Sequence, residues 1–343
     1  MQYNVHMNVR ERFHRLMRFE TVDRLPCVEW ATWWDKTIER WKTEGLVIAP
    51  QPPLNEGQAL MLQLGLDLHL QMWVNIDTAR TPKPAYHGAP IIHSLAEYEA
   101  LLPTLYPDQA FSIDTLRAYK RYQESGEAVF WLTLLGPFWA PRTLLGIEPH
   151  LFAFYDEPEL MHRINADVAR FNLRVLEQVC GVLTPDFMTF AEDMSYNNGP
   201  MVSEAIFDEF LLPYYRLQIP AFRARGIRVF IDSDGDISMA IPWFERAGIE
   251  GVLPLEKQAG VDVATLRDTH PSFLFIGNYD KMCMPHGEAA MRAEFERLLP
   301  AMRRGGFIPS VDHQTPPGVS FELYKVYVRL LYEYAEKARQ IIR

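Results

Sequence analysis

The fold is decided by the stretch Phe230-Ile231-Asp232-Ser233-Asp234-Gly235-Asp236, in which an apolar run ends in closely spaced carboxylates. Short runs of apolar, β-branched and aromatic residues are typical of strands that are buried on both faces of a sheet. Asp232 and Asp234 are two residues apart, so on an extended strand end their side chains point to the same side. We therefore interpret the stretch as the end of a buried barrel strand that presents carboxylates to an active site.

The same pattern, a short apolar run followed by polar residues and then a helical stretch, recurs along the chain. The eight runs cover residues 27–31, 67–74, 128–134, 186–191, 228–231, 251–255, 272–276 and 306–310. Strands that alternate with helices at this spacing form right-handed units and a parallel sheet. Because there are eight runs, the sequence favours a closed α/β barrel of parallel strands, the (β/α)8 TIM barrel, over an open sheet.

Helical stretches separate the predicted strands, and several of them carry end signals. The expected helices cover residues 9–19, 158–183, 203–225, 237–247 and 286–304. Ser203 is expected to cap a helix, and Gly226 and Gly248 are expected to end two of them. Longer helical insertions, at about 36–66 and 81–126, are expected to lie over the mouth of the barrel. No glycine-rich nucleotide-binding motif follows a strand, which disfavours dinucleotide-binding and P-loop proteins.

Composition limits the classes of partner. The chain has 343 residues, of which 48% are hydrophobic, and a net charge of −10, so it would repel the phosphates of nucleic acid. Its three cysteines show neither metal-binding nor disulfide spacing, which indicates a reducing cytoplasm. No stretch approaches the roughly 20 apolar residues that a membrane helix needs, and no signal peptide is evident. We expect a cytoplasmic enzyme that binds neither nucleic acid nor a membrane.

In barrels of this type, the loops that follow the strands build the active site. Glu192, Asp232, Asp234, Glu256 and His313 each follow a predicted strand, and we predict that they are the catalytic residues. Carboxylates held close together raise one another's pKa or recruit a cation. A carboxylate pair with a histidine nearby suits general acid–base catalysis or a divalent metal.

Several polar residues at the strand ends also have a purely structural interpretation. Asp193 and Asp236 can cap helices, and the carboxylates of the opening stretch can bond loop amides. His313 can bond a backbone carbonyl, and Glu256 can have a structural role alone. The sequence leaves these alternatives open.

Aromatic side chains gather just after several strand ends, where they can wall a substrate pocket or belong to the core. The residues that we assign to substrate binding are Trp30, Trp33, Trp34, Phe138, Trp139, Tyr196, Asn278 and Tyr279. An indole-rich mouth suits an aromatic or a quaternary-ammonium substrate. Cys27 and Cys283 are expected to act as small buried hydrophobic residues rather than as nucleophiles.

Several motifs, in order along the chain, resemble those of the uroporphyrinogen decarboxylase superfamily. They are residues 10–26, Gly136-Pro137-Phe138, Ala191-Glu192-Asp193-Met194, Gly199-Pro200-Met201-Val202-Ser203, Asp232-Ser233-Asp234-Gly235, Gly277-Asn278-Tyr279-Asp280-Lys281 and residues 305–316. The resemblance covers nearly the whole chain, and the order and spacing of the motifs make it specific. It implies one distorted TIM-barrel domain over residues 1–343 and, as in related barrels, a homodimer.

The superfamily contains decarboxylases, which act on uroporphyrinogen without a cofactor, and methyltransferases. In the decarboxylases, a Gln-Ala-Gly-Arg segment supplies arginines for the carboxylates of the substrate. The matching region here, residues 29–35, carries acids and indoles and no arginine. A polyanionic porphyrinogen would be poorly neutralised, so the resemblance favours a methyltransferase, and a decarboxylase, which is a lyase, is the alternative.

The thiol-activating methyltransferases of the superfamily hold zinc with a His-x-Cys motif and a later cysteine. Asp232, Asp234 and His313 stand at those positions here, so the resemblance implies a site for zinc or another divalent metal built from carboxylates and imidazole. Such a site suits demethylation of a methoxylated or methylated small molecule more than thiol activation. The methyl group would pass to a corrinoid protein, giving methylcobalamin there, or to tetrahydrofolate. A non-catalytic member that presents a ligand to a partner is a further alternative.

Overall fold

The structure, a computed structural model, describes residues 6–339 and divides the chain into two compact units. The first unit combines the segments Met1–Leu70, Ala118–Phe130 and Val252–Arg343. The second combines Gln71–Arg117 and Trp131–Gly251. The prediction of one domain over residues 1–343 stays a prediction, and each unit is described by itself.

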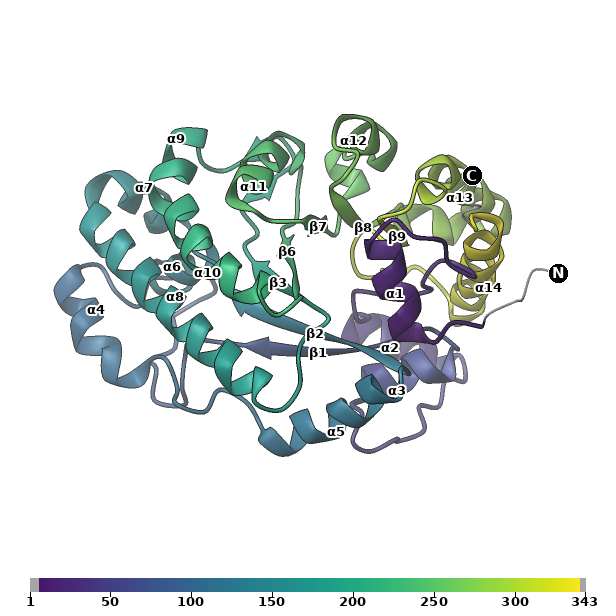
Figure 1. Ribbon diagram of the computed structural model, residues 1–343, viewed down its shortest axis with the longest axis horizontal. Helices are drawn as coiled ribbons and strands as arrows, with labels where there is room; N and C mark the ends of the chain where they lie inside the picture. The colour runs from purple at the N-terminus through teal and green to yellow at the C-terminus, as the bar shows by residue number, and fades with distance from the viewer. Residues whose placement is uncertain (1–5, 340–343) are drawn as a thin grey trace. The chain divides into compact units, whose positions relative to one another are not determined.

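Seven strands make up the main sheet, and their order follows the chain (Figure 1). They are β1 (Leu68–Val74), β2 (Ala128–Leu135), β3 (Phe187–Ala191), β6 (Arg228–Asp232), β7 (Gly251–Leu253), β8 (Leu274–Tyr279) and β9 (Phe307–Val311). The pairs β2–β3, β3–β6 and β8–β9 are parallel. The α/β fold with parallel strands is therefore confirmed, and it is that of a distorted TIM barrel.

The first predicted strand, residues 27–31, is wrong: these residues run alongside other segments of the first unit without joining a strand ladder. Side chains occupy two of the main-chain amides that a strand would use. Cys27 N donates to the carboxylate of Asp67 (2.8 Å), and Trp30 N donates to the hydroxyl of Ser310 (3.2 Å). Pro26, just before the run, has no amide hydrogen to donate. Among the described residues the sheet therefore has seven strands rather than eight.

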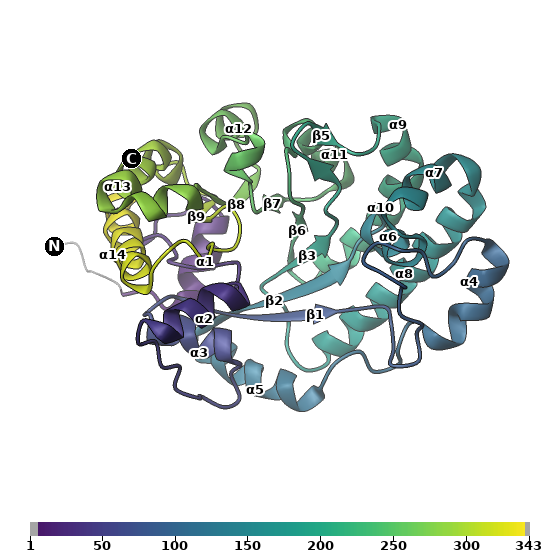
Figure 2. The same cartoon turned by 180° about the vertical axis from the view of Figure 1, so that it is seen from behind.

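In the second unit, helices pack beside the strands β3 and β6. Figure 2 shows α6 (Trp139–Leu145), α7 (Ile147–Asp156), α8 (Pro158–Cys180) and α10 (Leu212–Arg223) close to one another. A two-stranded antiparallel hairpin of β4 (Ser195–Tyr196) and β5 (Gly199–Pro200) follows β3. This unit also contains α4 (Leu95–Leu101), η1 (Leu102–Thr104), η3 (Ser238–Ala240) and α11 (Ile241–Ala247).

The helix predicted over residues 203–225 is present but broken. The hydroxyl of Ser203 accepts a hydrogen bond from Ile206 N (3.3 Å), which confirms the predicted cap. After α9 (Glu204–Ile206) the chain makes a π-helical turn, η2 (Phe207–Leu211), before α10 begins. Pro213 has no amide hydrogen and cannot continue the α-helical bonding pattern, and a wider turn just before it relieves that conflict.

In the first unit, the long helices α13 (Glu288–Met302) and α14 (Phe321–Lys337) lie side by side. The ring of Phe295 on α13 packs against Tyr327 and Tyr334 on α14, with ring centroids 5.9 and 5.0 Å away. The same ring contacts Tyr279 at the end of β8, at 4.6 Å. The other helices of this unit are α1 (Val9–Met17), α2 (Asp35–Thr43), α3 (Glu56–Gln63), η4 (Lys257–Ala259), α12 (Val263–Thr269) and η5 (Lys281–His286), while α5 (Ile113–Glu124) spans the unit boundary.

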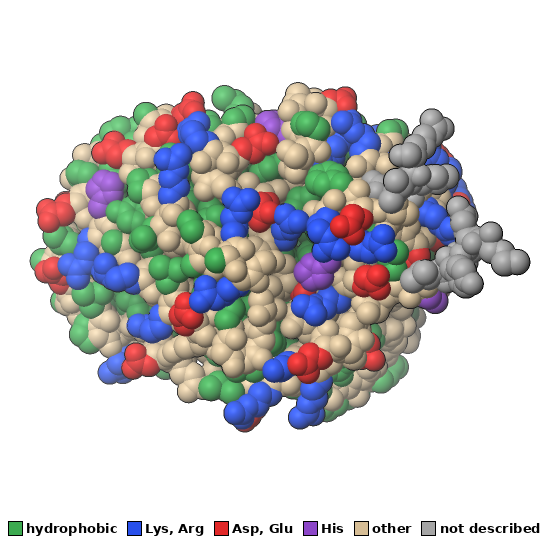
Figure 3. Space-filling view, viewed as in Figure 1, with side chains coloured by type: hydrophobic (Ala, Val, Ile, Leu, Met, Phe, Trp, Pro, Cys, Tyr) green, Lys and Arg blue, Asp and Glu red, His purple; other side chains and the backbone are tan. Residues whose placement is uncertain are grey.

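Both long insertions are helical, as predicted: residues 36–66 hold most of α2 and all of α3, and residues 81–126 hold α4 and α5. Their position over the barrel mouth stays a prediction. Across residues 6–339, no helix combines the length and the apolar character needed to cross a bilayer. The face of the molecule in Figure 3 intersperses basic and acidic side chains with scattered hydrophobic ones, as is ordinary for a protein surface.

A strained turn pins the loop that follows β7 in the first unit. Gly277 in β8 has φ +114°, and a Cβ atom there would lie 1.7 Å from the carbonyl oxygen of Pro254. Leu255 and Asn278 also have left-handed φ values of 62° each. The buried Asn278 amide donates to the carbonyls of Leu255 and Val261, at 3.0 Å each. These contacts fix the backbone from which Glu256 projects.

Gly277→Ala should destabilise the protein by about 3 kcal/mol. The new methyl group collides with the Pro254 carbonyl, and alanine is strained at the positive φ of this position. Gly260→Ala is the matched control, since Gly260 has φ +92° but no atom within 4 Å of its added Cβ. That variant should lose only about 1 kcal/mol. Denaturant titration measures both, and equal losses would show that the close approach to Pro254 carries no cost.

Candidate active site

Parallel pairing in the second unit brings three of the predicted catalytic residues to one edge of the sheet. Asp232, the last residue of β6, pairs with Ala191 at the end of β3. The carbonyl oxygen of Asp232 accepts hydrogen bonds from Glu192 N (2.9 Å) and Asp193 N (3.4 Å). Asp234 N donates in turn to the Asp193 carboxylate at 3.4 Å. Glu192, Asp232 and Asp234 are thus neighbours, as the sequence predicts.

The carboxyl group of Asp232 favours its protonated form. Burial raises its pKa well above the ordinary range, and the charges of Asp193 and Asp234 add to the rise. Asp193 has φ 38°, a left-handed value that is uncommon for a residue other than glycine. Such strain is concentrated at functional sites.

Glu192 is fully buried, and each of its carboxylate oxygens has a partner inside the protein. Oε2 accepts from Phe138 N and Trp139 N, at 2.9 Å each, and Oε1 accepts from the hydroxyl of Tyr215. Burial raises the pKa of Glu192 to about 8, although these three hydrogen bonds oppose the rise. Gly136 leaves room for the side chain, because a Cβ atom there would lie 1.9 Å from Oε1. Glu192 therefore holds the start of α6 in place.

In the first unit, Glu256 and His313 come together after β7 and β9. Each is half-buried, and each offers a ligand atom within 4.8 Å of the other. The ring of Trp30 meets His313 edge-on, with centroids 6.3 Å apart. The indole nitrogen of Trp30 donates to the carbonyl of Val311 (2.5 Å), which fixes the ring beside the histidine.

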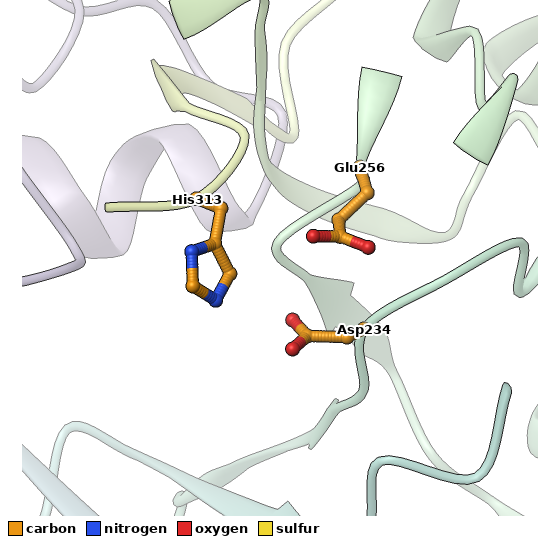
Figure 4. Close-up of side chains that lie close together, drawn as sticks. All are labelled: Asp234, Glu256 and His313. Atoms are coloured by element: carbon orange, nitrogen blue, oxygen red, sulfur yellow. The ribbon is translucent and has the colours of Figure 1, made fainter. Parts of the chain in front are cut away.

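Within the first unit, Glu256 and His313 could hold a metal ion together, since a ligand atom of each lies within 4.8 Å of the other (Figure 4). The close-up shows the carboxylate of Glu256 beside the ring of His313. Carboxylate oxygen and imidazole nitrogen are donors that suit zinc and several other divalent ions. The metal ligands predicted from the sequence are Asp232, Asp234 and His313. Within the first unit it is Glu256 that lies beside His313, and metal binding by Asp232, Asp234 and His313 stays a prediction.

Two of the structural interpretations can be compared with the observed contacts. Asp236 accepts a hydrogen bond from Ser238 N (3.0 Å), but the residue that caps η3 is Ile237, without a side-chain bond, so the cap interpretation is wrong for Asp236. Asp193 precedes the hairpin strand β4 rather than a helix, so the cap interpretation is wrong for that residue. The catalytic roles of Glu192, Asp232, Asp234, Glu256 and His313 stay predictions.

Two of the aromatic residues assigned to substrate binding, Trp33 and Phe138, are buried. Trp33 is 6% exposed and packs against Trp41 and Tyr324, with ring centroids 5.9 and 5.6 Å away. Phe138 is fully buried and contacts His150 at 4.7 Å. Both rings therefore serve the core of their own unit.

The other assigned residues differ in exposure. Trp34 and Tyr196 are 43% and 54% exposed, while Trp30 and Trp139 are half-buried. Asn278 and Tyr279 are buried within the first unit. Trp30 and Trp34 keep surface that a substrate can reach, and substrate binding by all of these residues stays a prediction.

A cavity of about 470 Å³ lies in the first unit between α2 and α3. Trp33, Ile38 and Leu60 form part of its wall, and the acids Asp35 and Glu39 are among its polar lining. Its volume falls in the range of small-molecule sites. Glu256 and His313 are not among its lining residues, so the cavity is separate from that pair.

Of the two cysteines predicted to be buried, Cys27 is buried and Cys283 is only half-buried. Cys27 is buried, and burial raises the pKa of its thiol. Burial also raises the pKa of Cys283 to about 12, and its thiol donates to the hydroxyl of Tyr279 (3.2 Å). Both shifts disfavour the thiolate form that a nucleophile or a zinc ligand needs.

Several residues that shape the site were not singled out in the sequence. Glu29 is buried, accepts from the hydroxyls of Ser310 (2.8 Å) and Tyr324 (2.7 Å), and has a pKa raised to about 7 by burial. Tyr215 lies inside a helix, where nothing marks it as the partner of Glu192. Lys281 did carry a signal, since it ends a motif that resembles the superfamily.

The family of the chain follows from a sequence profile described as uroporphyrinogen decarboxylase (URO-D), which matches residues 72–334. The chain belongs to this family. The match spans more than half of the chain and confirms the resemblance noted from the motifs. No curated protein matches the chain.

Solved structures support the fold of this uroporphyrinogen decarboxylase family member. A methyltransferase from Methanosarcina mazei is similar with a TM-score of 0.66 and 15% identity, over 96% of this chain and 99% of that one. A B12-independent methionine synthase from Shewanella has a TM-score of 0.42 and 12% identity, over 67% and 68% of the two chains. At such low identity the first likeness shows the fold alone, and the second carries no argument.

Replacing Glu192 with glutamine should weaken the pH dependence of stability. The pKa of Glu192 rises from 4.5 to about 8 on folding, so between these pH values the folded protein binds more protons than the unfolded chain. The free energy of unfolding therefore falls as the pH rises. Between pH 6 and pH 9, the free energy of unfolding of the wild type should fall by about 2–3 kcal/mol because of this group. The Glu192→Gln variant should not show this fall.

Denaturant titrations at several pH values measure this difference. Tyr215→Phe is the control, because it removes one hydrogen bond that opposes the pKa rise and should move the loss of stability to higher pH. If the free energy of unfolding varied with pH in the same way for the wild type and Glu192→Gln, the raised pKa of Glu192 would be contradicted.

Proposed function

We propose that this protein is a methyltransferase that removes a methyl group from a small methylated molecule with the help of a divalent metal, zinc being the best candidate. The observation that carries the proposal is the pair of Glu256 and His313 in the first unit, whose ligand atoms lie within 4.8 Å of one another. Membership of the uroporphyrinogen decarboxylase family, whose superfamily includes methyltransferases, supports it. So does the likeness in fold to a protein described as a methyltransferase.

The donor set indicates the type of chemistry. The carboxylate of Glu256 and the neutral imidazole of His313 are donors that suit a divalent cation. A bound metal would supply Lewis acidity, which draws negative charge from the atom that loses the methyl group. Thiolate ligands are absent from this pair, and the thiols of Cys27 and Cys283 have raised pKa values, so activation of a thiol on the metal is disfavoured.

The protein's own side chains would bind and orient the substrate. The Trp30 indole lies edge-on beside His313 and is held by Val311, so it offers a fixed aromatic wall. Trp34, on the same segment, is 43% exposed. Aromatic walls of this kind suit a methoxylated aromatic ring or a quaternary amine, through stacking or cation–π attraction.

The acceptor of the methyl group is proposed to be a corrinoid protein or tetrahydrofolate, as the resemblance implies. Asp232 would assist as a proton-holding acid, because burial and neighbouring charges keep its pKa raised. The homodimer and the cytoplasmic location that we expect from the sequence stay predictions.

Decarboxylation of a porphyrinogen is the second candidate, because the matching profile carries that name. It would require cations to neutralise the substrate's carboxylates. The segment 29–35 supplies none, and the end of β6 instead adds Asp232 and Asp234. Release of carbon dioxide from uroporphyrinogen tests this candidate, and we expect none. A ligand-binding role without turnover is the third candidate.

Methyl transfer is tested by incubating the zinc-loaded protein with methoxylated aromatics or quaternary amines and a corrinoid protein, while following the corrinoid absorption spectrum. Wild-type protein should methylate the corrinoid with at least one substrate class. Glu256→Gln and His313→Ala should each lower the rate more than tenfold, because they remove a metal ligand. Asp236→Asn is the control, since an asparagine oxygen can accept the hydrogen bond from Ser238 N as the aspartate does, and the rate should stay unchanged.

Two results would count against the proposal. Full activity of Glu256→Gln and His313→Ala would remove the metal site from the mechanism. Binding of a methylated ligand without any turnover, with corrinoid proteins and with tetrahydrofolate, would favour a ligand-binding protein.

A further inference from the structure

The carboxylate of Asp312 connects the two metal-ligand candidates of the first unit through the backbone. Asp312 precedes His313 directly in the chain. Its Oδ2 accepts a hydrogen bond from Lys257 N (3.0 Å), which is the amide of the peptide bond that follows Glu256. The buried carboxylate of Asp312 therefore contacts the peptide bond that follows Glu256 and belongs to the residue just before His313.

A lysine from the next strand end completes this arrangement. Asp312 Oδ1 accepts from Lys281 N (3.3 Å) and from the Lys281 ammonium group (3.0 Å). Asp312 is fully buried and the side chain of Lys281 is 14% exposed, so this is an ion pair largely removed from water. The ammonium group also donates to the amide oxygen of Gln258 (2.6 Å), next to Lys257 in the chain.

The strand ends that carry Glu256 and His313 are thus joined at a single carboxylate. Asp312 N donates to the carbonyl of Tyr279 (2.9 Å), so the main chain of β8 takes part as well. Both oxygens of Asp312 are occupied by donors from the protein, and Asp312 is not in the pair that could hold a metal. Its charge is balanced by Lys281 and does not compete for a cation.

We propose that Asp312, held by Lys281, is a positioning residue that sets the spacing of Glu256 and His313 as a pair of ligands for a divalent cation. The inference rests on the metal site of the proposed function and names the contacts that preorganise it. A cation site binds tightly when its ligands are held at the right separation before the ion arrives. Asp312 does not touch the cation and acts through the two peptide units.

The test measures zinc affinity by competition with a chromophoric chelator, for the full-length protein at neutral pH. Asp312→Asn should bind zinc at least tenfold more weakly than the wild type, because the neutral amide loses the ion pair and can no longer accept all three hydrogen bonds. Lys281→Gln should weaken zinc binding in the same direction, and Lys281→Arg should restore it. This pair tests the inference even where Asp312→Asn fails to fold.

A matched control separates positioning from general stability. Asp23 also accepts hydrogen bonds from two main-chain amides, Met7 N (3.1 Å) and Arg24 N (2.9 Å), and pairs with one cation, Arg12. Those amides adjoin neither Glu256 nor His313. Asp23→Asn should therefore lower the denaturation midpoint while leaving zinc affinity within twofold of the wild type.

The outcomes separate this inference from the proposed function. Zinc binding by the wild type, with weaker binding in Asp312→Asn or Lys281→Gln but not in Asp23→Asn, supports the positioning role. Unchanged affinity in both Asp312→Asn and Lys281→Gln overturns the positioning role and leaves the metal site standing. Absence of zinc binding in the wild type overturns both the metal part of the proposed function and the positioning role.

Discussion

Parallel pairing of strands is the constraint on which the candidate site depends. Because neighbouring parallel strands end at the same edge, residues that follow them are brought together whatever their separation in the sequence. In the second unit, the pairing of Ala191 with Asp232 makes Glu192 and Asp193 neighbours of the carboxylates after β6. In the first unit, the pairing of Tyr279 with Val311 brings the segment that starts at Asp280 beside Asp312. The chemistry at the strand ends follows from this register.

The apolar runs were sufficient to predict the class of fold, seven of the eight strands and the main helices. The run at 27–31 misled because its composition is that of a strand while side chains bond two of its amides, and apolar periodicity carries no information about such partners. The helix over 203–225 was predicted without its π-helical turn, which reflects a local conflict at Pro213 rather than a change in hydrophobic pattern. Hydrophobic patterns in the sequence indicate which segments are buried, but they do not indicate individual hydrogen bonds.

The sequence predicts which strand-end residues make up the candidate site. It does not predict which of them bind a metal, hold a proton or support the others. His313 is expected among the metal ligands, and within its own unit the carboxylate beside it is that of Glu256, which the resemblance does not assign to the metal. Spacing along one strand placed Asp232 beside Asp234, but burial and like charges favour its protonated form. Tyr215 gave no sequence signal, because its contact with Glu192 arises only when a helix packs on the strand end.

The central claim is that this member of the uroporphyrinogen decarboxylase family binds a divalent metal through carboxylate and imidazole groups rather than thiolates. X-ray absorption at the zinc edge, on protein loaded with one equivalent of zinc and freed of excess metal, tests that claim most directly. We predict nitrogen and oxygen neighbours at about 2.0–2.2 Å with the outer-shell pattern of an imidazole. Sulfur neighbours at about 2.3 Å, or a protein that retains no zinc, would contradict the account.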